Sequence, residues 1–303
     1  ALRVLLALGG STNAVIHLAA IAGRLGIRMG LERLNTLSDE TPVLVNLKPV
    51  GQNYMEDFFA AGGVGAVLRE LKPLLNLDCM TVTGETLGER IEAADGFVDR
   101  SIIASRDAPV EGQGGLVALF GSLAPRGAIL KRSAADPRLF EREARAVVFT
   151  SLADLAQRID DPDLDVSQDD ALVLLNAGPR SDAAMPEAGY LPIPKKLAAA
   201  GVKDMIRISD ARMSGTAFGT IVLHVTPDAA GGGPLGLVRN GDRIRLSVAG
   251  RRLDLLVDEA ELGRRRAAAE STAPAPARRG YAKLYQQEIL DADEGCDFAF
   301  LRP

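Results

Sequence analysis

A serine set among small residues is the first candidate for chemistry in this sequence. Ser214 lies in the stretch DMIRISDARMSGTAFG, where a short alternating run at 205–209 leads into a polar turn and a second run, 220–225, leaves it. This pattern predicts strand, turn and strand. Small neighbours leave the Ser214 hydroxyl accessible to a ligand, and Asp210 and Arg212 place charge beside it. The alternative is an ordinary polar turn.

A glycine-rich loop near the start of the sequence is the second candidate. Residues 9–13 (GGSTN) precede an apolar run, 14–25, that predicts a buried helix. Ser11 or Thr12 can cap that helix. Backbone N–H groups at such a helix start can bind a carboxylate or a phosphate, whereas the alternative is a tight turn before a core helix. His17, on the same helix, is interpreted as a core residue rather than a ligand.

Composition excludes several functional classes. The 303 residues are 47% hydrophobic and 25% charged, with a net charge of -5 and no tryptophan, which is typical of a globular protein with a real core. No basic patch stands out, so we expect no nucleic-acid partner. The nearest basic run, Arg264-Arg265-Arg266, is interpreted as solvated.

Neither a membrane anchor nor a cysteine framework is expected. The opening ALRVLLAL is too short to span a bilayer and lacks the features of a signal peptide. Cys79 and Cys296 lie far apart and outside any Cys/His cluster, which argues against a zinc site or disulfides. Reduced cysteines and a cytoplasmic location are therefore expected.

The elements that must position these residues fall into two parts. Residues 1–96 predict a partial α/β domain, with a buried strand at 42–47 and a helical pattern at 54–71 that breaks at its paired glycines. Thr86 and Glu89 have capping-box spacing for a further helix. This part reads as the end of an α/β domain.

The second part, 97–303, is rich in short β-type runs separated by Gly and Pro. These runs cover 116–120, 128–131, 146–149 and 171–175, besides the pair around Ser214. The remaining predicted elements are a helix at 152–159 capped by Ser151, a hairpin at 236–248 turning at Asn240-Gly241, a strand at 252–257, a linker at 267–279 and a terminal helix at 281–292. The predicted fold is α/β, with a β-rich, barrel-like (swivelling β/β/α) second domain flanked by helices.

Several stretches, read in order, resemble one protein family. They are GGSTNAVIHL, YMEDFFAAGG, TVTGETLGE, GGLVALFGSLAPRGAILK, NAGP, MPEAGYLPIPKKL, SDARMSGTAFG and GGPLGLVRNGD. In this colinear order they resemble the IlvD/Edd dehydratases, which include dihydroxy-acid, phosphogluconate and sugar-acid (aldonate) dehydratases. The chain resembles the C-terminal half of these longer polypeptides.

The resemblance implies two cofactors, a [2Fe-2S] cluster and Mg²⁺. In the family the N-terminal half carries the cluster cysteines and most of the acidic magnesium ligands. Cluster ligation usually takes three or four thiolates. This chain has only Cys79 and Cys296, and neither lies in a matching motif. We therefore expect the cluster ligands outside this chain segment.

The family reaction removes water from a 2,3-dihydroxy carboxylate to give a 2-keto acid. Ser214 falls on the position of the family's serine base, and a serine hydroxyl needs nearby cations to lower its pKa. Glu187, in MPEAGY, matches a magnesium-ligating glutamate, and a carboxylate suits that ion. The expected substrate contacts are Thr216, Ser11, Thr12, Asn13, Asp210 and Arg212. An alternative for Asp210 and Arg212 is that they orient the loop.

The ending GYAKLYQQEILDADEGCDFAFL and the SDARMSGTAFG stretch resemble the arabinonate/xylonate type, so a sugar acid is the preferred substrate. Three segments depart from the family pattern: Ser181 to Ala184 before MPE, Asp107 to Gly112, and Ser122. One alternative is a dihydroxy-acid dehydratase of branched-chain amino-acid synthesis. Another is an inactive partial chain that serves only as a structural or interaction domain. A homodimer or homotetramer is expected from the family.

Overall fold

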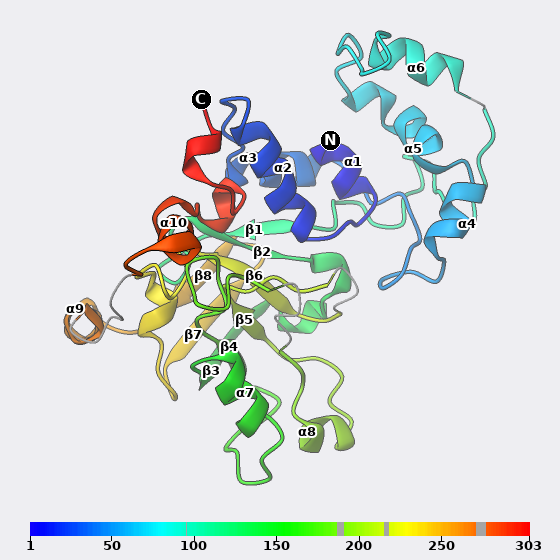
Figure 1. Cartoon of the computed structure of the whole chain (residues 1–303). Helices are drawn as coiled ribbons and strands as arrows, with labels where there is room; N and C mark the ends of the chain where they lie inside the picture. Colours follow the sequence, from blue (N-terminus) through cyan, green and yellow to red (C-terminus); the bar gives the residue numbers. More distant parts are fainter. Residues whose placement is uncertain (95, 187–190, 215–217, 271–276) are drawn as a thin grey trace.

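The structure is a computed structural model that describes residues 1–94, 96–186, 191–214, 218–270 and 277–303. Its α-helices are α1 (Leu2–Ala7), α2 (Asn13–Gly23), α3 (Leu31–Glu40), α4 (Met55–Ala60), α5 (Gly63–Leu71), α6 (Leu87–Ala93), α7 (Leu152–Arg158), α8 (Lys195–Ala199), α9 (Glu259–Glu270) and α10 (Gly280–Glu288). Its strands are β1 (Val117–Leu119), β2 (Gly127–Leu130), β3 (Glu141–Phe149), β4 (Ala171–Leu174), β5 (Arg207–Ser209), β6 (Ile221–Thr226), β7 (Arg243–Ser247) and β8 (Arg252–Leu255). Figure 1 shows the helices arranged around the strands.

The eight strands found in the described residues form one sheet that nearly closes into a barrel. Its order is β1-β2-β6-β5-β4-β3-β7-β8, with β3, β4, β5 and β6 parallel and the other pairs antiparallel. The two outer strands meet where the Phe120 N–H donates to the Arg251 oxygen and the Leu253 N–H donates to the Phe120 oxygen, each at 2.9 Å. The prediction of an α/β fold with a barrel-like sheet is confirmed.

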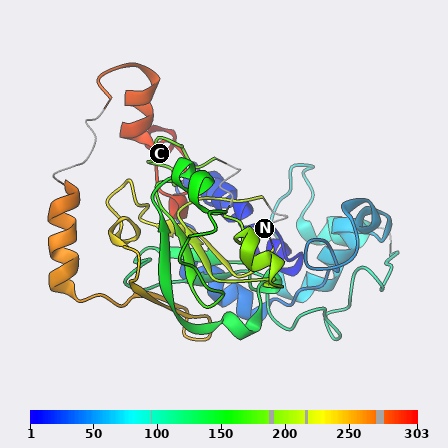
Figure 2. The ribbon, with the colours of Figure 1, turned by 90° about the horizontal axis from the view of Figure 1, so that it is seen from below.

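Alternation along the strands separates the barrel interior from its outer surface. In β2, Ala128 and Leu130 belong to the interior cluster, whereas Ile129 packs on the outside with α1 and α3. On β4, Val173 faces inward and Leu172 faces outward. This is the period of two expected for a strand covered on both faces. Figure 2, seen from below, shows helices on the periphery of the strands.

A smaller lobe of α4, α5 and α6 extends from the barrel (Figure 1). It packs on α1 through a buried cluster that includes Ala7, Phe58 and Val67. The predicted break in the 54–71 helix is confirmed, because Gly62 and Gly63 adopt positive φ values of 109° and 53°. The predicted capping box is also confirmed, since the Thr86 Oγ1 accepts from the Glu89 N–H. The division at residue 96 stays a prediction.

The expected strand at 42–47 is wrong as a regular element. The segment is extended, but it makes only single-residue bridges, from Val43 to Glu111, from Val45 to Ile103 and from Leu47 to Asn53. Its partners lie in irregular chain, so no ladder forms. Apolar composition identified its burial but not its pairing.

The expected hairpin turn at Asn240-Gly241 is also wrong. The hairpin joins β7 to β8 and turns at 248–251. Asn240 instead accepts the Val148 N–H through its side-chain oxygen at 2.6 Å, and the Gly241 N–H donates to Ala146. The Asn-Gly pair therefore lies against the end of β3.

The expected linker at 267–279 is partly wrong, because α9 continues to Glu270. Arg265 on this helix has a side chain only 10% exposed and pairs with Asp242 at 2.5 Å and with Glu261 at 2.8 Å. Its predicted solvation is therefore wrong. The terminal helix, α10, ends at Glu288, earlier than expected.

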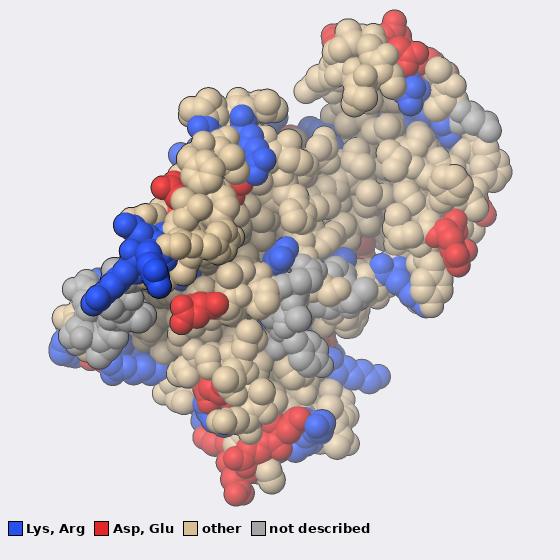
Figure 3. Space-filling view, in the orientation of Figure 1, with Lys and Arg blue, Asp and Glu red and all other residues tan. Residues whose placement is uncertain are grey.

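Charge on the visible face is mixed. Figure 3 shows acidic and basic side chains in separate small groups, the largest acidic group lying toward the α7 end of the molecule. Within the described residues, no helix combines the length and the apolar character that crossing a bilayer would require.

Candidate functional site

The segment that carries Ser214 begins at the end of β5. The Ser209 hydroxyl donates to the Leu174 oxygen at 2.9 Å and accepts the Ala211 N–H at 3.0 Å. Ser209 is fully buried, whereas Ser214 is exposed. The chain is therefore anchored at the barrel before it turns out to present Ser214.

Asp210 organises the loops at this end of the barrel. Its side chain is fully buried, with one oxygen accepting the Ala177 N–H at 3.0 Å and the other accepting the Ala229 N–H at 2.9 Å. Burial raises the pKa of Asp210 to about 7, although the two N–H donors act in the opposite direction. These contacts give Asp210 a positioning role, and its predicted contact with substrate stays a prediction.

The glycine-rich loop lies against the Ser214 segment. The Asn13 Nδ2 donates to the Met213 oxygen at 3.1 Å. The Ser11 hydroxyl accepts the Asn13 N–H at 3.2 Å, at the start of α2, and Thr12 is buried. The fold thus brings together two of the predicted regions, the 9–13 loop and the chain next to Ser214. Their roles in substrate binding stay predictions.

Arg212 connects a third region to the same place. Its Nε donates to the Met185 oxygen at 3.0 Å, which ties the segment before Glu187 to the segment before Ser214. Glu187 and Thr216 themselves lie outside the described residues. The contact between Arg212 and Met185 therefore places two segments side by side but leaves the magnesium role of Glu187 a prediction.

A cavity of about 320 Å³ adjoins the contact between Arg212 and Met185 and is also lined by residues of α10. Its lining includes His17, Arg212, Tyr285 and Cys296. The prediction that His17 is a core residue is wrong, because α2 turns this side chain outward and leaves it exposed. No pattern around His17 indicated this orientation, since nearly every neighbour of His17 on the helix is apolar.

Two buried polar residues, Lys131 and His224, were not predicted as site residues from the sequence. Lys131, directly after β2, is only 9% exposed. His224, in β6, is 3% exposed, and its Nε2 has no hydrogen-bond partner among the described residues. Burial, with Arg212 nearby, lowers the pKa of His224 to about 3, so the ring is neutral. The available signal was a polar residue within an apolar run.

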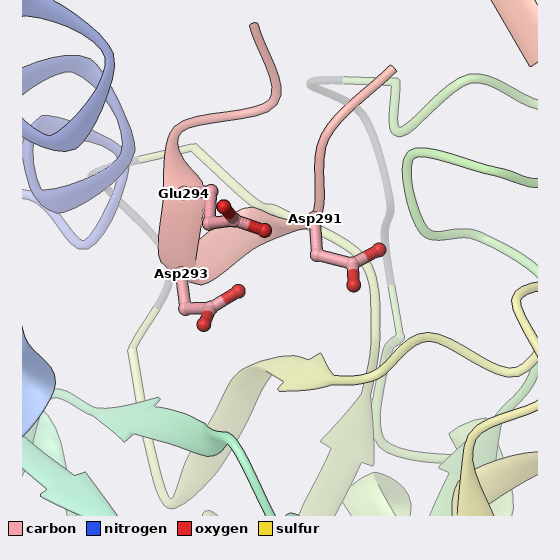
Figure 4. A group of neighbouring side chains, drawn as sticks. All are labelled: Asp291, Asp293 and Glu294. Carbon is pink, nitrogen blue, oxygen red and sulfur yellow. The ribbon is translucent and has the colours of Figure 1, made fainter. Parts of the chain in front are cut away.

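Asp291, Asp293 and Glu294 form the one group of metal-ligand type among the described residues (Figure 4). Arg126 pairs with all three, at 2.6, 2.8 and 2.7 Å respectively. Arg180 adds a second contact to Asp291 at 2.8 Å. The cluster is therefore an ion-pair network, since its charge is balanced by guanidinium groups.

The two cysteines do not fit an iron–sulfur cluster. Cys79 is exposed, and Cys296 packs with its sulfur 3.3 Å from the Met185 sulfur. Burial raises the pKa of Cys296 to about 12, whereas a cluster ligand must be a thiolate. Neither cysteine belongs to a group of three potential ligands within the described chain.

Comparison with known proteins places the sequence in one family. The family model described as the dihydroxy-acid/6-phosphogluconate dehydratase C-terminal domain matches residues 101–296, and the N-terminal model of the same family matches residues 1–90. The chain is 48% identical to an L-arabonate dehydratase of Azospirillum brasilense, over 99% of this chain and 53% of that protein. It is 49% identical to a 6-deoxy-6-sulfo-D-gluconate dehydratase of Pseudomonas putida, over 99% of this chain and 52% of that protein.

A dihydroxy-acid dehydratase of Nitratidesulfovibrio vulgaris (strain DP4) is 42% identical, over 96% of this chain and 53% of that protein. The chain spans about half the length of the curated relatives that it matches. Both family models match in order and together cover most of the sequence. The chain therefore belongs to the dihydroxy-acid/6-phosphogluconate dehydratase family.

Proposed function

We propose that this chain is part of a hydro-lyase that converts a sugar acid (an aldonate) into a 2-keto-3-deoxy acid. The observation that carries the proposal is the hydrogen bond from Asn13 to Met213, which joins the 9–13 loop to the segment presenting Ser214. The similarity to an L-arabonate dehydratase and to a sulfogluconate dehydratase supports a polar sugar-acid substrate.

In the proposed reaction Ser214 removes the proton from C2 of the substrate. The electron pair of that C–H bond forms the C2–C3 double bond, and the C3 hydroxyl leaves with a proton as water. The resulting enol then becomes the 2-keto acid. The exposed Ser214 can reach a substrate, whereas the buried Asp210 holds the loop. A serine hydroxyl needs neighbouring positive charge to act as a base at neutral pH.

Two cofactors are part of the proposal. Glu187 would contribute a carboxylate to Mg²⁺, and a divalent cation at the substrate would make the C2 proton more acidic. The [2Fe-2S] cluster would have its ligands outside this chain, because neither Cys79 nor Cys296 fits that role. The steps assigned to this chain do not involve the cluster.

A second candidate is the dehydration of a branched-chain dihydroxy acid. The 42% identity to a dihydroxy-acid dehydratase favours it. The two candidates differ in the distal part of the substrate, which is polar in an aldonate and apolar in dihydroxy-isovalerate. Direct competition between these two compounds separates them.

The test assembles this chain with the N-terminal half of the Azospirillum brasilense relative and measures keto-acid formation from L-arabinonate and from dihydroxy-isovalerate. We expect turnover of the aldonate and its loss in Ser214→Ala, with unchanged iron content. Ser101→Ala is the matched control, since Ser101 is exposed and bonds to Asp99 in the distant lobe. If Ser214→Ala retains turnover, Ser214 is not the base. An assembly that binds iron but dehydrates neither compound favours a purely structural role.

A further inference from the structure

Lys131 is a buried cation that no described residue neutralises. It follows β2 directly and is 9% exposed, and its ammonium makes no hydrogen bond or ion pair with the part of the chain that the structure describes. Burial lowers its pKa. The next residue, Arg132, shows the usual arrangement, since it donates to the Gly114 oxygen at 2.7 Å and to Gln113 at 2.9 Å. A buried charge is costly unless something pairs with it.

The side of the barrel on which Lys131 lies follows from the strand before it. Leu130 belongs to the barrel interior, whereas Ile129 packs against the helices outside. Because side chains alternate along a strand, Lys131 lies on the outer side with Ile129. β2 also pairs with β6, the strand into which the Ser214 segment leads.

On that outer side, the segment after Lys131 contacts both the Ser214 turn and the neighbourhood of the 9–13 loop. Gly219, at the far end of the Ser214 turn, donates its N–H to the Ala134 oxygen at 2.9 Å. The Ser133 N–H donates to Gly115, and a Cβ on Gly115 would lie 3.0 Å from the Gly9 Cα. The short segment after Lys131 therefore touches the end of the Ser214 turn and reaches the 9–13 loop through Gly115.

We propose that the Lys131 ammonium binds the carboxylate of the substrate beside Ser214. This inference rests on the proposed function, and it assigns a binding residue for which the sequence offered no motif-based role. The carboxylate is the anionic group that an aldonate brings to the site, and it adjoins the carbon that loses its proton. Negative charge grows on its oxygens during that step, so a fixed cation favours the transition state more than the ground state.

Competitive acetylation of this chain tests the contact directly. Acetic anhydride modifies neutral amines, and mass spectrometry reads each lysine separately. We expect L-arabinonate at ten times its dissociation constant to slow modification of Lys131 about tenfold. The uncharged arabinitol should give no protection, and the exposed Lys203 should be unaffected by either compound. Equal protection by both compounds, or protection by neither, overturns the proposal.

Kinetics in the assembled enzyme provide the second measurement. Lys131→Met should lower kcat/KM for the aldonate roughly 10- to 100-fold, as expected for a lost hydrogen bond to a charged group. Lys131→Arg should retain more activity, and Lys203→Met should match the wild type. If Lys131→Met has wild-type kinetics, the contact between Lys131 and the substrate carboxylate is ruled out, whereas the proposed dehydratase function is not. The contact is also ruled out if the added N-terminal half protects Lys131 without aldonate, since the lysine would then pair with protein.

The failure of this proposal can be told apart from a failure of the proposed function. An assembly that turns over no aldonate, while L-arabinonate still protects Lys131, leaves the carboxylate contact standing and overturns the dehydratase activity. If Lys131→Met does not fold, shown by loss of its thermal transition, the acetylation result on the wild-type chain decides.

Discussion

Asn13 and Met213, 200 residues apart in sequence, are joined by a hydrogen bond of 3.1 Å from the Asn13 side-chain amide to the Met213 carbonyl oxygen. This bond connects the start of α2 with the segment that presents Ser214. The contact from Arg212 to Met185 lies on the same segment, so the loop is held from two directions. Disturbing either contact should affect the position of Ser214 more than the barrel.

Replacing Asn13 by Asp tests the first contact with almost no change in size. A carboxylate cannot donate to the Met213 oxygen, so two acceptors would face each other. We expect the free energy of unfolding to fall by roughly 1–3 kcal/mol. In the assembled enzyme kcat should fall as well. Urea unfolding and aldonate turnover measure the two effects. Asn76→Asp, on the exposed surface, is the control and should leave both unchanged. A variant at position 13 that behaves like this control contradicts the prediction.

Replacing Asp210 by Asn tests its positioning role. The two carboxylate oxygens accept the N–H groups of Ala177 and Ala229. Whichever way an amide is turned, its NH₂ group faces one of these donors. The free energy of unfolding should therefore fall by roughly 1–3 kcal/mol, measured by urea denaturation. The exposed Asp182→Asn serves as control. Equal stability of the two variants would show that the hydrogen bonds from Ala177 and Ala229 to Asp210 do not stabilise the fold.

His224 predicts a pH dependence of stability. Its pKa is about 3 in the folded chain and 6.5 in the unfolded chain, so the unfolded state binds more protons between these values. The contribution of His224 to the free energy of unfolding should rise with pH in this window, by up to about 1.4 kcal/mol per pH unit, and should be constant above it. The raised pKa of Asp210 gives a slope of opposite sign, so the His224 contribution is read as the difference between the wild type and His224→Asn. His224→Asn should remove the His224 slope, since Asn tolerates the positive φ of 57° at this position. His17→Asn, at the exposed histidine, should keep the slope. An unchanged slope in His224→Asn would show that another group causes this pH dependence.

Arg126 tests the assignment of the acidic cluster. Arg126→Met leaves Asp291, Asp293 and Glu294 without their shared partner and should lower the free energy of unfolding by roughly 1–3 kcal/mol. Arg245→Met, which removes an exposed pair with Glu143, should cost about 0–1 kcal/mol. Adding Mn²⁺ or EDTA should not shift the Tm of the wild-type chain, whereas Mn²⁺ should stabilise Arg126→Met. A rise in Tm with Mn²⁺ that occurs in the wild type and equally in Glu187→Gln would make the cluster a metal site.

Local patterns in the sequence were sufficient for many elements of the fold. Short apolar runs bounded by turn residues predicted β4 and β6, and capping residues predicted the starts of α6 and α7. These patterns succeed because each depends on neighbours a few residues away. The prediction of a hairpin turn at Asn240-Gly241 failed for the converse reason, since that pair is held by β3, where Val148 lies 92 residues earlier in the chain.

The sequence by itself determined the alternating strands, the breaks at paired glycines and the order of motifs that places the chain in its family. Only the tertiary structure decided which polar groups meet. It brought Asn13 to Met213, exposed His17, and buried Lys131 on the outer side of the barrel without a partner among the described residues. The physical reason is that periodicity encodes which face of an element is buried. The partner of a polar group depends instead on how distant segments cross, and no local pattern carries that information.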